Sequence, residues 1–138
     1  MNFREIGNDV NLINPIETER VKEIVESLLE NGWIGAPMLL SEYGMFTGSH
    51  RLEALRALAA AETFSYMEEY GITEEIAEEY KSKIDEILET EVAVDVTEEV
   101  EEWMERTGET LEYIDYSELG KIFEGTWVEE YKDEIVEW

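Results

Sequence analysis

The sequence predicts one α+β domain, in which a small mixed sheet packs against helices. Three short apolar segments are typical of strands, at residues 10–13, 38–47 and 92–96. Longer segments repeat apolar residues every three or four positions, which is typical of amphipathic helices. Apolar residues make up 43% of the 138 residues, enough for one hydrophobic core of ordinary size.

The first strand and helix are separated by a proline. The strand at 10–13 ends before Pro15, because proline fixes its own φ and disfavours a helical conformation in the residue before it. A single apolar stripe then predicts a helix over Glu19–Glu30, with Thr18 as its N-terminal cap. Gly32 ends this helix, since it follows the last periodic residue and tolerates positive φ.

The middle of the chain predicts a hairpin followed by a helix. Residues 38–40 and 45–47 form its two arms, and residues 41–44 form the turn between them. Gly48 comes directly after the second arm. The residues that follow it repeat apolar side chains at helical spacing and predict a helix with leucines facing the core.

The second half is mainly helical and strongly acidic. Periodicity predicts a helix over Thr73–Glu89, a strand over Val92–Val96, and a short helix over Glu98–Arg106 that ends at Gly108. Two further helical stretches are expected near 117–123 and 126–136.

These elements suggest how the chain is organised. We expect residues 1–97 to form the sheet domain, with a helical insertion at about 62–90. Residues 98–138 are expected to form an acidic helical extension that packs on the same core.

Charge divides the chain more sharply than hydropathy does. The net charge is −26, yet residues 1–61 hold 9 acidic and 5 basic side chains, whereas residues 62–138 hold 27 and 5. Such a chain repels phosphate backbones, so direct nucleic-acid binding is disfavoured. The acidic half either keeps the protein soluble or presents a negative face to a partner.

Several classes of site are excluded by composition. The chain has no cysteine, which removes disulfides and thiol catalysis, and its single histidine, His50, cannot build a multi-histidine zinc site. No metal site is predicted. Because no apolar run approaches the ~20 residues that span a bilayer and no basic leader precedes one, we expect a soluble, cytoplasmic protein without membrane partners.

The junction between the hairpin and the following helix carries the clearest chemical signal. Gly48 lets the backbone turn tightly, and the helix behind it offers free N–H groups and a positive dipole end to an anion. Ser49 can donate to a phosphate oxygen, His50 can donate or move a proton, and Arg51 can add a bidentate fork. The plainer alternative is a serine cap followed by a surface histidine and arginine. Arg20 and Arg56 are expected to pair with neighbouring glutamates.

The order of these features resembles the ParB/sulfiredoxin-like superfamily. The matching features are Asn14-Pro15, the helix Glu19–Glu30, Gly32 with Pro37, the hairpin, and Gly48-Ser49-His50-Arg51 with Ala54. The similarity covers residues 9–61 well and residues 92–97 loosely. It implies that the loop from Gly48 to Arg51 holds a nucleotide, ATP or a related one, with Mg²⁺ as a possible companion.

Differences within that superfamily narrow the activity that the resemblance implies. Ser49 stands where sulfiredoxins have their redox cysteine, so reductase activity is not expected. The loop is similar to that of the superfamily's free-serine kinases, and Glu17 lies near the place of the kinases' catalytic glutamate. Thr47 replaces the kinases' aspartate, a carboxylate that would help to position magnesium. Glu17 and His50 are therefore the candidate catalytic residues.

Two functions follow from the sequence. The first is nucleotide binding, with ATP-dependent phosphoryl transfer or hydrolysis as its enzymatic form. The alternative is a non-enzymatic acidic protein that imitates DNA and captures a basic nucleic-acid-binding protein through its C-terminal half. Both fit an origin in a phage or mobile element, where the resembling domains are common.

Overall fold

The fold is α+β. The computed structural model describes residues 1–6, 16–35, 37–42, 44–45 and 48–108. The strand expected at 10–13 and the helical stretches expected at 117–123 and 126–136 lie outside these residues. Within the described part of the chain, no helix is both long and apolar enough to cross a bilayer.

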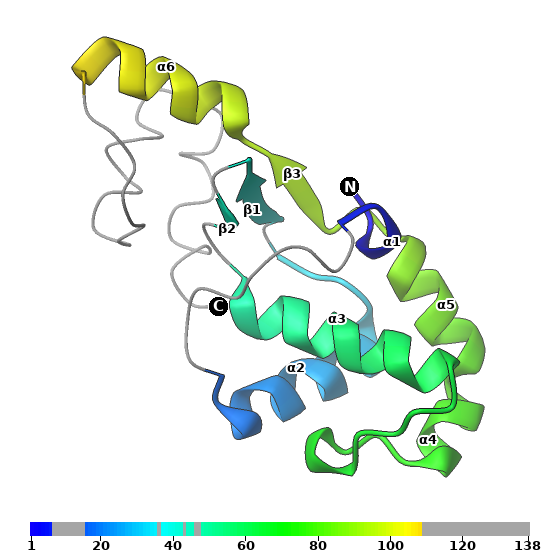
Figure 1. The fold of residues 1–138 in the computed structure, drawn as a ribbon. Coiled ribbons are helices and arrows are strands. Elements are labelled where there is room, and N and C mark those ends of the chain that lie inside the picture. Colours follow the sequence, from blue (N-terminus) through cyan, green and yellow to red (C-terminus); the bar gives the residue numbers. More distant parts are fainter. Residues whose placement is uncertain (7–15, 36, 43, 46–47, 109–138) are drawn as a thin grey trace.

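Two long helices form the centre of the molecule. Helix α2 (Thr18–Asn31) buries the predicted stripe, and α3 (Ser49–Glu62) packs beside it (Figure 1). The buried residues of α3 include alanines as well as leucines, which allows the neighbouring backbones to approach closely. The predicted helix Glu19–Glu30 is thus confirmed with one extra residue at each end. Thr18 is its first residue rather than its cap, and Glu17 before it makes no side-chain cap bond.

A three-stranded mixed sheet lies at one end of this helical layer. Its strands are β1 (Met38–Ser41), β2 (Gly44–Met45) and β3 (Ala93–Asp95), in the order β2-β1-β3. β1 runs antiparallel to β2 and parallel to β3. All three apolar residues of β1 are buried, as expected of the central strand of a covered sheet. The predicted hairpin is confirmed through Met45, with its first strand one residue longer and its second beginning one residue earlier than expected, and the rest of the second arm, residues 46–47, lies outside the described residues. The later strand is confirmed but is shorter than predicted.

The insertion differs from the prediction of one helix over Thr73–Glu89. The helix is broken at Tyr80 into α4 (Glu74–Glu79) and α5 (Lys81–Glu89), and a 3₁₀ turn, η1 (Glu68–Tyr70), precedes them. Thr73 caps α4, because its hydroxyl accepts a hydrogen bond from the Ile76 amide at 3.3 Å. The break changes the direction of the chain, so that α5 turns its apolar residues into the core while α4 lies over the end of α3 (Figure 1).

Two helices lie at the edges of the fold. The short α1 (Phe3–Ile6), which sequence reasoning did not predict, packs Phe3 and Ile6 against the core. Helix α6 (Thr97–Thr107) follows β3 and buries Val100 and Trp103. It ends at Gly108, as predicted.

The C-terminus of α3 is closed by a Schellman motif with an unusual residue in it. The Ser65 amide donates to the Ala60 carbonyl at 3.0 Å, and the Phe64 amide donates to the Ala61 carbonyl at 3.2 Å. This motif places Phe64 at φ +62°, where glycine or asparagine is usual, and among the described residues Phe64 is the single non-glycine with positive φ. Phe64 is 82% exposed, so packing does little to offset the backbone strain.

Replacing Phe64 with glycine should therefore stabilise the fold. The Phe64→Gly substitution removes the left-handed strain and little buried area, so we expect the free energy of unfolding to rise by about 0.5–1 kcal/mol. Urea unfolding of the two proteins measures this difference. A lower free energy of unfolding in the variant would show that the exposed ring contributes more to stability than its position costs.

Replacing Gly48 with alanine should destabilise the fold strongly. Gly48 has φ +95°, and a Cβ there would lie 2.5 Å from Cγ of Met38 on the buried strand β1. Gly108 provides a matched control, since it has φ +70° with no atom within 4 Å of such a Cβ. We expect Gly48→Ala to lower the free energy of unfolding by about 2 kcal/mol more than Gly108→Ala, because only the first adds a core clash. Equal losses would contradict this packing argument.

Candidate anion site where two helices begin

The first turn of α3 holds an unusual cluster of buried polar residues. Ser49, His50 and Arg51 are 0%, 5% and 9% exposed, and they make up the buried polar set of the described residues. Gly48 precedes them in the left-handed conformation, and its carbonyl accepts the first helical hydrogen bond from Leu52 at 2.8 Å. The plainer interpretation of a surface histidine and arginine is therefore wrong. Polar groups are buried at this cost only where they make specific contacts.

His50 links the beginning of α3 to the beginning of α2. Its Nε2 accepts a hydrogen bond from the Glu17 backbone amide at 3.1 Å, across 33 residues of sequence. Nε2 must be unprotonated to accept this bond, so the neutral ring carries its proton on Nδ1. The two residues that the sequence predicted as catalytic thus lie beside each other, although Glu17 contributes its backbone to this contact and its side chain is exposed.

The surroundings of His50 favour the neutral ring. Burial lowers the pKa of His50, the positive charge of Arg20 lowers it further, and the Glu17 carboxylate opposes both effects. Because the unfolded chain has the ordinary pKa of about 6.5, the protein loses stability as pH falls below that value. At neutral pH, His50 therefore acts as an uncharged hydrogen-bonding group at this site.

Arg51 turns toward the protein. Its Nη2 donates to the Ile34 carbonyl at 2.9 Å, and its guanidinium carbon lies 4.4 Å from the centre of the Trp33 ring. Gly35 leaves room for this contact, because a Cβ at this position would lie 2.8 Å from Nη2 of Arg51. The sequence predicted Arg51 as a phosphate fork and gave no role to residues 33–35. Two glycines that flank Trp33 and Ile34 were the available signal for a close approach of this segment.

Several positive features meet at this corner of a strongly acidic protein. Helices α2 and α3 have 14 residues each, and both begin on the same side of the molecule (Figure 1). Each contributes the positive end of its dipole, and the charges of Arg20 and Arg51 lie close by. The arrangement suits an anion.

Metal ligation finds no support in the same region. Among residues 1–6, 16–35, 37–42, 44–45 and 48–108, no three histidine, cysteine or carboxylate side chains gather in a way that could hold a metal ion. Thr47, where the resembling kinases have an aspartate, lies outside the described residues.

Comparison with known proteins gives no family for this chain: no protein-family model, no curated protein and no solved structure matches it.

Proposed function

We propose that this protein binds the phosphate groups of a nucleotide at the corner where α2 and α3 begin. ATP is the first candidate. The observation that carries the proposal is the bond between the Glu17 amide and His50 Nε2, which joins two helix starts at one place. A phosphate beside both would interact with two positive dipole ends. The similarity of Gly48–Arg51 to nucleotide-binding loops of the ParB/sulfiredoxin-like superfamily supports the same proposal.

The residues at the corner take different parts in this proposal. Arg20, on the exposed first turn of α2, provides the charge that reaches an incoming phosphate. Arg51 is a positioning residue, since it holds Trp33 and Ile34 against the beginning of α3. Gly48 sets the direction of the first turn of α3, whose backbone N–H groups would face the anion.

Phosphoryl transfer or hydrolysis is the enzymatic form of the proposal. Glu17 has an exposed carboxylate at this corner, and it would take the proton from an attacking hydroxyl group or water. His50 would hold that end of α2 in place through the Glu17 amide. Mg²⁺ would enter with the nucleotide, held by the phosphates rather than by a preformed protein site.

Calorimetric titration with ATP, ADP and CTP in the presence of magnesium tests the proposal. We expect ATP to bind, and Arg20→Gln to weaken binding about tenfold through the loss of one charge-assisted contact. Lys22→Gln is the matched control. It removes one positive charge from the same helix, but Lys22 lies beside Gly71, so binding should change less than about twofold. Arg51→Ala should abolish binding, with circular dichroism to verify that it folds. The absence of binding by every nucleotide, or equal affinity of Arg20→Gln and the wild type, would refute the proposal.

A second candidate function is capture of a basic protein by the acidic half. The observation in its favour is the exposed side of α6, which carries glutamates at 98, 101, 102 and 105 opposite the buried Val100 and Trp103. Their spacing puts them along one side of the helix, as a surface that imitates a phosphate array requires. Exposed carboxylates also favour solubility, so they do not by themselves distinguish the two roles. A site that recognises a particular basic group would distinguish them.

A further inference from the structure

Phe64 combines two features that stability alone does not explain. It occupies a left-handed position where glycine is usual, and this large aromatic residue is 82% exposed. Strained, non-glycine backbone and exposed aromatic rings are both concentrated at binding sites. Phe64 also lines a cavity, where its ring can contact a ligand.

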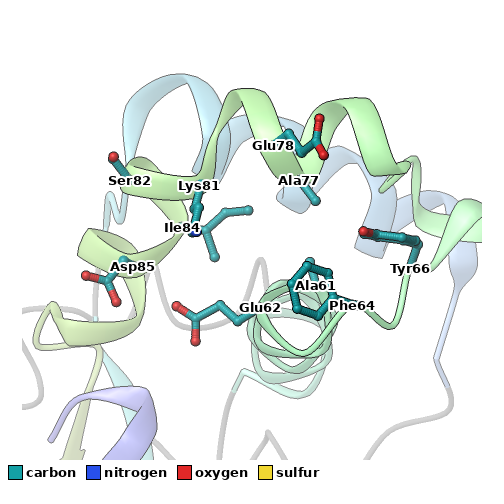
Figure 2. A pocket seen from close by; sticks show the side chains of 10 residues that line it. All are labelled: Ala61, Glu62, Phe64, Tyr66, Ala77, Glu78, Lys81, Ser82, Ile84 and Asp85. Atoms are coloured by element: carbon teal, nitrogen blue, oxygen red, sulfur yellow. The ribbon is translucent and has the colours of Figure 1, made fainter.

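The cavity lies between the end of α3 and the helices α4 and α5, and its volume is about 520 Å³. Its apolar lining includes Ala61, Ala77 and Ile84. Figure 2 shows the rings of Phe64 and Tyr66 toward one end of the cavity, with the Glu78 carboxylate above them. The carboxylates of Glu62 and Asp85 lie toward the other end.

Carboxylates at one end of this cavity already form ion pairs with a cationic side chain of this protein. Nη2 of Arg4 lies 3.2 Å from Oε1 of Glu62 and 3.0 Å from Oδ1 of Asp85, so a guanidinium bridges that end of the rim. Glu74 and Glu78 have no ion-pair partner among the described residues, and both act on the Tyr66 hydroxyl, whose pKa is raised by burial and by their charge. The aromatic end of the cavity therefore has negative charge without a bound cation.

The backbone adds to this preference. Ala61 and Glu62 belong to the last turn of α3, and a helix C-terminus is the negative end of its dipole. Aromatic faces, carboxylates and a helix C-terminus all attract the same ligand, a cation with an apolar stem.

We propose that this cavity binds a lysine or arginine side chain of a basic partner segment, with the charged group between Phe64, Tyr66 and Glu78. The stem of the side chain lies along the apolar lining of the cavity. The proposal rests on the capture of a basic partner and gives that function a location. It does not depend on nucleotide binding.

The undescribed end of this chain does not fit the same cavity. Residues 109–138 contain 10 acidic and 2 basic side chains, so their charge has the same sign as the rim. A separate basic segment complements that charge, and the proposal commits to such a partner.

Nuclear magnetic resonance titration of the full chain with a defined peptide tests this inference. The probe is an acetylated and amidated peptide of sequence GLRGLRG, and its control has citrulline in place of each arginine, which keeps the shape and removes the charge. At about 0.15 M salt, where surface attraction is screened, we expect the arginine peptide to shift the amide signals of Phe64, Tyr66 and Glu78. The citrulline peptide should bind at least about fivefold more weakly.

Four variants separate the cavity from general acidity. Phe64→Leu, which keeps an apolar side chain, and Glu78→Gln should each weaken peptide binding about three- to tenfold. Glu79→Gln removes an equal charge from the same helix outside the cavity and should leave binding unchanged. Phe64→Gly should lose binding although its thermal unfolding midpoint rises, a combination that a purely structural role for Phe64 does not produce.

The outcomes distinguish the two proposals. If the arginine peptide binds but the Phe64 and Glu78 variants bind it like the wild type, the cavity is not the site, while capture of basic partners stands. If the arginine peptide does not bind, or binds no better than the citrulline peptide, both the cavity and the capture of basic partners are refuted.

Discussion

The hydrogen bond from the Glu17 amide to His50 Nε2 is the contact on which the arrangement of this protein depends. It joins the beginnings of α2 and α3, two helices whose buried apolar side chains pack in one core. Around it, Ser49 and Arg51 are buried, and Arg51 donates to the Ile34 carbonyl rather than to water. A directional contact of this kind requires a neutral histidine, and burial together with the charge of Arg20 provides one.

Helix α3 connects two sites that favour ligands of opposite charge. Its first turn lies among positive features, where we propose a phosphate site, and its last turn borders a cavity with carboxylates and aromatic rings. The dipole of α3 favours both sites, because its positive end lies at Gly48 and its negative end lies at Glu62. The uneven charge of the sequence thus has a counterpart in the fold, since α4 and α5, which belong to the acidic half, pack against α3 and border the cavity at its negative end.

Periodic apolar residues predicted α2, α6 and the mixed sheet because burial of one face dominates the energetics of each element. The same signal missed the break at Tyr80, since α4 and α5 each keep a helical period and differ only in the direction of their faces. Gly48–Arg51 was predicted as one cluster from its order along the chain. The inward turn of Arg51 onto Trp33 depends on a contact between distant segments, which local spacing does not encode. The strain at Phe64 is likewise visible only from φ.

The protonation of His50 tests the account most directly, because the chain has a single histidine and its ring signals are unambiguous. Two-bond ¹H–¹⁵N correlation spectra at neutral pH identify which ring nitrogen carries the proton. We expect a neutral ring protonated on Nδ1, with a pKa below the ordinary value of about 6.5. A ring protonated on Nε2, or one that is charged at neutral pH, would contradict the bond to Glu17 and with it the joined helix starts.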